Sequence, residues 1–160
     1  MSKTLYIMCG VPGSGKTWFA KNKLMKKYDY YISRDEVRFS IIKDDEEYFS
    51  HETVVFNKFV EKIAVALLWR GDGNVIADAT HLNWGSRRKL LNALKACYPI
   101  ETLNIIPVVI EAKLDDIFER NKLREGRARV PEETIRRMYR NISDPVKDPY
   151  HYTAIMKVKN

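Results

Sequence analysis

One segment of the chain has the residue types and spacing of a phosphate-binding loop. Residues 10–17, Gly-Val-Pro-Gly-Ser-Gly-Lys-Thr, fit the pattern G-x-x-x-x-G-K-[ST]. Glycine lets the backbone turn tightly, so that successive N–H groups point at an anion. In this pattern the lysine reaches the β- and γ-phosphates and the hydroxyl residue holds Mg²⁺. The residues expected to bind the nucleotide are therefore Gly10, Pro12, Gly13, Ser14, Gly15, Lys16 and Thr17.

A second pair of candidate residues follows the short apolar run at residues 30–32. Asp35 and Arg38 are three positions apart, which places them on one face of a helix. A kinase needs a carboxylate to accept the proton of the attacking hydroxyl and a cation to hold the acceptor. A helix-capping aspartate beside a surface arginine would give the same spacing, so both interpretations stay open.

A third group consists of Asp78 and an arginine cluster. Asp78 ends the apolar run at residues 75–77, where a Walker-B type carboxylate helps to hold Mg²⁺. Arg124, Arg127 and Arg129 fall between two predicted helices, and a mobile arginine there can stabilise a transferring phosphoryl group. The alternatives are an aspartate in an ordinary turn and a solvated basic surface.

The elements that would position these residues follow an alternation of short apolar and longer amphipathic runs. This alternation predicts an α/β, P-loop NTPase/kinase fold: a five-stranded parallel sheet flanked by helices, with the site at the strand C-termini. We expect an arginine-rich lid over about residues 113–142. The predicted strands span residues 5–9, 30–32, 75–77, 103–110 and 154–158. The main predicted helices span residues 36–42, 51–70, 84–96, 114–123 and 131–141.

The composition is that of one soluble globular domain over residues 1–160, with 45% apolar and 31% charged residues. We find no apolar run of membrane length and expect no signal peptide and no membrane partner. Cys9 and Cys97 form no metal-type pair, which favours a cytoplasmic protein. The formal charge of +7 suits a polyanionic partner without identifying it.

These motifs, in this order, resemble the polynucleotide 5′-hydroxyl kinase domain of phage-type end-healing enzymes, within the wider P-loop (AAA-type, zeta-toxin-like) kinase group. The resemblance covers roughly residues 5–139. It is carried by the phosphate loop, by Ser-Arg-Asp-Glu-Val-Arg at 33–38, by Asp-Ala-Thr-His-Leu-Asn at 78–83 with Arg87 and Arg88, and by Arg-Glu-Gly-Arg-Ala-Arg-Val-Pro at 124–131, followed by Met138 and Tyr139.

The resemblance implies roles for single residues. Asp35 would be the general base on the acceptor 5′-hydroxyl, and Arg38 would bind the acceptor 3′-phosphate. Asp78 would orient Arg38 or the metal. Either Arg124 or Arg127 would stabilise the transferring phosphoryl group. The family has arginine directly before a glycine of the lid, which is Gly126 in this chain, and this chain has Glu125 at that position. The family also usually carries a 3′-phosphatase domain, for which these 160 residues leave no room.

The function predicted from the sequence is transfer of the γ-phosphate of ATP, with Mg²⁺, to the 5′-hydroxyl of DNA or RNA. One alternative is a P-loop kinase of a small hydroxyl acceptor such as a metabolite, nucleoside or antibiotic. Another is a nucleotide-binding ATPase module that acts through partners. The choice between ATP and GTP, the preferred nucleic acid, the existence of a separate phosphatase partner and the oligomeric state stay open.

Overall fold

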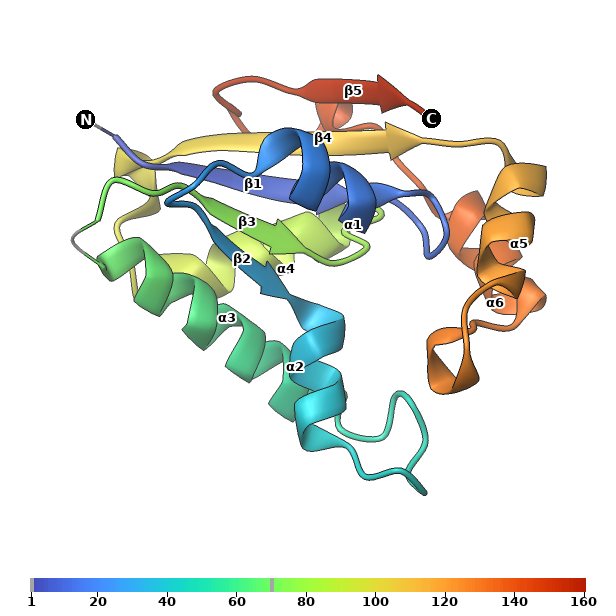
Figure 1. Cartoon of the computed structure of the whole chain (residues 1–160). Helices are drawn as coiled ribbons and strands as arrows, with labels where there is room; N and C mark the ends of the chain where they lie inside the picture. The colour runs from blue at the N-terminus through green and yellow to red at the C-terminus, as the bar shows by residue number, and fades with distance from the viewer. Residues whose placement is uncertain (1, 70) are drawn as a thin grey trace.

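The fold is organised around a five-stranded parallel sheet (Figure 1). The computed structural model describes residues 2–69 and 71–160. The strands are β1 (Thr4–Cys9), β2 (Tyr30–Ser33), β3 (Val75–Asp78), β4 (Asn104–Glu111) and β5 (Met156–Lys159). Their order is β2-β3-β1-β4-β5, and all four neighbouring pairs are parallel. The predicted fold class is confirmed, and each strand lies within about two residues of its predicted position.

The central strand shows why these apolar runs form a buried sheet. Alternate side chains of β1 point to opposite faces, and both faces are covered. Leu5 and Ile7 belong to one core cluster with residues of α3 (Glu52–Leu68) and α4 (Trp84–Lys95). Met8 belongs to a second cluster on the other face, against which Phe19 and Leu24 pack. Figure 1 shows α1 on the face opposite to α3 and α4.

The remaining helices frame the carboxyl ends of the strands. The phosphate loop leads into α1 (Lys16–Phe19), which continues as a π-helical segment, η1 (Ala20–Leu24). The others are α2 (Arg34–Ile41), α5 (Leu114–Lys122) and α6 (Glu132–Arg140). Figure 1 shows α5 and α6 beyond the strand ends, apart from α2. The last residue of the predicted helix 51–70 lies outside the described residues. No helix among the described residues is long and apolar enough to cross a bilayer.

The start of α2 differs from the prediction for a local reason. The helix begins at Arg34, two residues early, because Ser33 is its N-cap and its hydroxyl accepts a hydrogen bond from the Glu36 backbone at 3.2 Å. The interpretation of Asp35 as a capping residue is therefore wrong. The N-cap of α4 is Asn83, in a reciprocal capping box with Ser86.

Candidate active site at the carboxyl end of the sheet

The phosphate loop uses two of its glycines for backbone conformations that other residues rarely adopt. Gly13 and Gly15 have φ angles of 85° and 93°, in the left-handed region. A Cβ atom at Gly13 would also lie 2.8 Å from the Ile117 carbonyl oxygen of α5. The loop therefore requires glycine at both positions, although the motif specifies only Gly15 and leaves position 13 open.

Residues far away in the sequence form hydrogen bonds with the backbone of the phosphate loop and hold it in place. The Gly10 N–H donates to the Thr80 carbonyl at 2.9 Å. Arg120 and the Asn160 side chain both donate to the Ser14 carbonyl, at 3.1 and 2.9 Å. These contacts were not predicted, because each joins residues far apart in the chain. Gly10 and Ser14 themselves line a separate cavity of about 430 Å³, and the Ser14 hydroxyl is buried without a hydrogen-bond partner.

Asp78 lies directly beside the end of the phosphate loop. Its Oδ2 accepts hydrogen bonds from the Thr17 hydroxyl at 2.8 Å and from the Tyr31 hydroxyl. Its Oδ1 lies 3.6 Å from the Lys16 ammonium. Burial by itself would favour the neutral acid, but Lys16 and the two hydroxyl donors lower the pKa of Asp78 below its ordinary value. The carboxylate is therefore charged at neutral pH.

The same residues fit a nucleotide-borne Mg²⁺. Asp78 Oδ1 is buried and has no hydrogen-bond partner, and the Thr17 hydroxyl is the neighbouring oxygen. Mg²⁺ is usually bound through one or two protein oxygens together with substrate phosphates and water. Among residues 2–69 and 71–160, no group of three or more His, Cys, Asp or Glu could hold a metal ion on its own. The oxygens present thus suit a metal that arrives with phosphates.

Asp35 and Arg38 form an ion pair on α2. Arg38 Nη1 lies 2.5 Å from Asp35 Oδ1, and the Tyr48 hydroxyl donates to the same oxygen. Burial and the nearby Asp35 carboxylate raise the pKa of Tyr48, so the phenol keeps the proton that it donates. Arg38 is only 4% exposed. The interpretation of Arg38 as a surface arginine is therefore wrong.

Glu52, the first residue of α3, fixes the other end of Arg38. Its carboxylate accepts from Arg38 Nε at 2.9 Å and from Nη2 at 3.1 Å. It also accepts from Arg34 Nη2 at 2.9 Å. Glu52 and Tyr48 were not predicted as site residues. An acidic residue in the first turn of a helix and a tyrosine in a loop have ordinary local explanations, so the sequence carried no signal for either.

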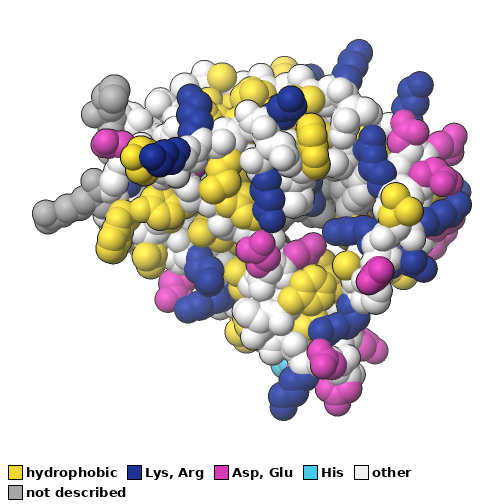
Figure 2. Space-filling view, viewed as in Figure 1, with side chains coloured by type: hydrophobic (Ala, Val, Ile, Leu, Met, Phe, Trp, Pro, Cys, Tyr) yellow, Lys and Arg dark blue, Asp and Glu magenta, His cyan; other side chains and the backbone are white. Residues whose placement is uncertain are grey.

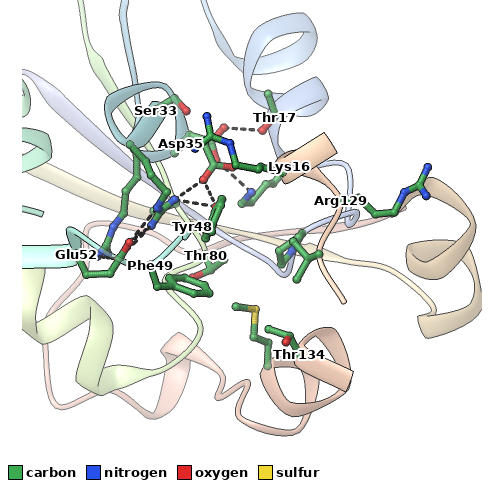
Figure 3. A pocket seen from close by; sticks show the side chains of 18 of the residues that line it. Lys16, Thr17, Ser33, Asp35, Tyr48, Phe49, Glu52, Thr80, Arg129 and Thr134 are labelled. Carbon is green, nitrogen blue, oxygen red and sulfur yellow. Dashed lines mark hydrogen bonds and ion pairs between the residues drawn. The ribbon is translucent and has the colours of Figure 1, made fainter. Parts of the chain in front are cut away.

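One pocket of about 520 Å³ joins the two carboxylates (Figure 3). The predicted site residues that line it are Pro12, Lys16, Thr17, Asp35, Arg38, Asp78 and Arg127. Figure 2 shows the surface hollowed between α2 and the α5–α6 segment, with basic side chains on both sides. The sheet therefore brings the phosphate loop and the Asp35–Arg38 pair to a common space.

The two candidate lid arginines line different cavities beside the phosphate loop. Arg127 lines the large pocket, donates to the Lys43 carbonyl at 2.8 Å and lies 5.4 Å from the centre of the Phe39 ring. Arg124 lines a smaller cavity of about 190 Å³ with Gly13, Gly15 and Lys16. Gly126, between them, has a φ of 56°. Of these two arginines, only Arg127 lines the pocket that contains Asp35.

Arg87, one of the residues that carried the resemblance, is structural in its contacts. It is fully buried and forms a two-point ion pair with Asp148, at 2.7 and 2.9 Å. It also donates to the His81 carbonyl at 2.9 Å. His81 itself has a φ of 40°, which is uncommon outside glycine. Arg87 therefore supports the turn that follows Asp78 and does not line the large pocket.

Comparisons with known proteins agree with the observed fold. A family model described as an AAA domain matches residues 5–145. Two solved structures of a Pnkp1/Rnl/Hen1 complex, one named as an RNA repair complex, contain a similar fold. The identities are 24% and 18%, the TM-scores 0.60 and 0.66, and the matches cover 74% and 88% of this chain. This chain spans only 39% and 44% of those chains.

A sugar kinase from Janibacter sp. HTCC2649 has a similar fold over nearly its whole length. The identity is 16% and the TM-score 0.59, with 99% of this chain and 86% of that chain covered. At these identities the likeness shows a shared P-loop kinase fold and does not show a shared acceptor.

Proposed function

Because the chain belongs to the AAA-domain family, we propose that it is a P-loop kinase that transfers the γ-phosphoryl group of ATP to a hydroxyl acceptor. The observation that carries this proposal is that Lys16 and Asp35 line one pocket. Phosphoryl transfer requires an aligned phosphate site and a group that takes the proton of the nucleophile. A hydrolysing module would have no need of the Asp35–Arg38 pair in that pocket.

We assign the proton transfer to Asp35. The contacts of its carboxylate with described residues all go to Oδ1, from Arg38 and Tyr48. Oδ2 is thereby left to accept the proton of the attacking hydroxyl. Because Glu52 and Asp35 already engage three nitrogens of Arg38, we assign Arg38 mainly to the orientation of Asp35, and only secondarily to an acceptor phosphate.

The opposite side of the pocket would hold the donor. Lys16 would neutralise charge on the β- and γ-phosphates, and Thr17 with Asp78 would hold Mg²⁺, which supplies further charge neutralisation when bound. We propose that residues 113–142 act as the lid of one kinase domain. In this arrangement Arg127 would stabilise the transferring phosphoryl group, and Arg124 would contact the nucleotide in the smaller cavity beside Gly13 and Gly15.

We propose the 5′-hydroxyl end of a polynucleotide as the acceptor. Five arginines line the pocket: Arg34, Arg38, Arg127, Arg129 and Arg137. Guanidinium groups bind phosphate oxygens bidentately, and the chain as a whole carries a formal charge of +7. The shared fold with chains of an RNA repair complex also supports this acceptor.

The test is transfer of labelled γ-phosphate from ATP to DNA and RNA oligonucleotides with 5′-hydroxyl ends. We expect labelling by the wild type and none by Lys16→Ala. Oligonucleotides that already carry a 5′-phosphate should not be labelled. Absence of labelling by a protein that binds ATP would overturn the polynucleotide acceptor.

A second candidate is a small hydroxyl compound as the acceptor. The pocket volume of about 520 Å³ lies within the range of small-molecule sites, and a sugar kinase shares the fold. Labelling of a metabolite, with no labelling of oligonucleotides, would favour this candidate. ATP hydrolysis that no acceptor stimulates would instead favour an ATPase module.

A further inference from the structure

One exposed aromatic side chain lines the pocket beside its charged residues. Phe49 lies in the loop before α3 and is 52% exposed. Among the exposed large hydrophobic side chains of the described residues, it alone lines the pocket that contains Lys16 and Asp35. Single exposed apolar residues are common on protein surfaces, so the exposure by itself means little. Phe49 lines a pocket together with five arginines, so a ligand that contacts its ring would need an apolar surface beside its charged groups.

The ring of Phe49 is fixed by its neighbours. It packs edge-to-face against Tyr48, with ring centres 4.6 Å apart and planes at 83°. Tyr48 in turn packs against Phe39 at 5.9 Å. The Arg38 guanidinium lies 4.2 Å from the Tyr48 ring centre and 5.6 Å from that of Phe49. The ring is thus held in place before any ligand binds, while half of it remains open.

The ring is also tied to the proposed chemistry. Phe49 follows Tyr48 in the chain, and the Tyr48 hydroxyl donates to the Asp35 carboxylate. A group stacked on Phe49 would therefore contact the residue next to Tyr48, whose hydroxyl holds the proposed proton acceptor, Asp35. Figure 3 shows Phe49 near Tyr48, with Thr134 of α6 on the other side of the pocket.

An aromatic platform among arginines matches one ligand chemistry in particular. Proteins that bind single-stranded nucleic acid combine cationic groups for the phosphates with aromatic side chains on which bases stack. Arg34 and Arg38 are already paired with carboxylates of the protein, and Arg127 lies 3.6 Å from Asp44. Arg129 and Arg137 line the pocket without an ion-pair partner among the described residues, and a sugar or another uncharged hydroxyl compound would leave them without an anion. The combination therefore favours a nucleotide at the end of a strand, with its base on the aromatic ring.

We propose that Phe49 is a specificity-determining residue, which stacks on the nucleobase of the 5′-terminal nucleotide of the acceptor. This inference rests on the proposed polynucleotide kinase function and goes beyond it. The stack would place the terminal ribose so that its 5′-hydroxyl meets Asp35. Because every base has a π-face, the platform would hold any of them, and it would fail for an end that lacks a base.

The experiment compares two acceptors: an ordinary 5′-hydroxyl oligonucleotide and the same strand with an abasic 5′-terminal residue. For the wild type we expect kcat/KM to be roughly 10- to 100-fold lower on the abasic strand. Phe49→Ala should lose a similar factor on the ordinary strand and little more on the abasic one, because the two changes remove the same contact. Phe49→Trp should keep the discrimination between the strands.

Phe39→Ala is the matched control. Phe39 belongs to the same aromatic cluster as Phe49 but does not itself line the pocket. The substitution should leave the ratio between the two strands unchanged, whatever it does to the overall rate. Equal use of both strands by the wild type, or multiplying losses in Phe49→Ala, would overturn the stacking while leaving the kinase function intact. A complete lack of transfer to any oligonucleotide would overturn both.

Discussion

The donor and acceptor sides of the pocket are built in different ways. Asp78, on the donor side, has a side chain that is 3% exposed, and it is paired through the sheet with Met8 and Ser33. Asp35, on the acceptor side, has a side chain that is 40% exposed. Its partners come from its own helix and from the following loop. Backbone register thus fixes the donor carboxylate, whereas side-chain contacts fix the acceptor carboxylate.

This difference suggests that the two sides will respond differently to substitution. A change on the donor side alters groups that the sheet holds in place, and should affect nucleotide binding or folding. A change on the acceptor side alters a side-chain network, and should affect transfer while leaving ATP binding intact. The following predictions test this separation.

Replacing each carboxylate by an amide, in two separate variants, should give the largest contrast between loss of transfer and loss of ATP binding. Asp35→Asn should lower kcat by roughly 10²- to 10⁴-fold, because it removes the proposed general base, and should leave the Kd for ATP nearly unchanged. Asp78→Asn should weaken Mg²⁺-dependent ATP binding. Label transfer and ATP titration with and without Mg²⁺ measure both effects. Persistent labelling by Asp35→Asn would refute its role.

The second prediction concerns acid stability on the donor side. Burial lowers the pKa of His81 from its usual 6.5 to about 4, against the effect of its bond to the Met8 carbonyl. Below about pH 6.5 the unfolded chain binds a proton that the folded chain does not. The free energy of unfolding should therefore be highest above pH 6.5 and fall towards pH 4, by up to roughly 3 kcal/mol from this group.

Urea unfolding at pH 7 and pH 4.5 measures this effect. Because carboxylates also titrate in acid, the informative quantity is the difference between the wild type and His81→Gln. The variant should lose less stability on acidification. His151→Gln, the same change at an exposed histidine, should behave as the wild type does. Equal acid sensitivity of His81→Gln and wild type would contradict the prediction.

Removal of the Glu52 charge should have an intermediate effect on the acceptor side. Glu52→Gln leaves Arg34 and Arg38 without their shared carboxylate, so Arg38 should hold Asp35 less firmly. We expect kcat/KM for the acceptor to fall by about tenfold, the loss of roughly one charge-assisted hydrogen bond. The KM for ATP should not change.

Glu61→Gln is the control for Glu52→Gln, since it neutralises an exposed acid of the same helix. It should leave both kinetic parameters at wild-type values. A raised KM for ATP in Glu52→Gln would show that the two sides of the pocket are more strongly coupled than the contacts indicate.

The smallest expected effect is that of Tyr48→Phe. This change keeps the ring that packs against Phe39 and Phe49 and removes the hydroxyl that donates to Asp35. We expect kcat to fall by roughly 3- to 10-fold, as for the loss of one hydrogen bond. Steady-state label transfer measures it, and an unchanged kcat would show that Arg38 alone positions Asp35.

Sequence patterns were sufficient for much of the fold and for the phosphate loop, Asp78 and the Asp35–Arg38 pair of the site. The five strands, the phosphate loop and the position of Asp78 follow from apolar runs and from glycine at fixed spacing. The Asp35–Arg38 pair also follows, because residues three apart on a helix are neighbours. These features depend on local backbone geometry, which nearby residues determine.

Only the tertiary structure showed the groups that hold the acceptor side together. Glu52 meets Arg38 because α2 and α3 pack side by side, and Tyr48 reaches Asp35 from the intervening loop. Arg120 and Asn160 hold a loop more than a hundred positions earlier. The types of these residues are common and their spacing has no period. Their roles arise only when the chain folds, which brings together residues that no local pattern relates.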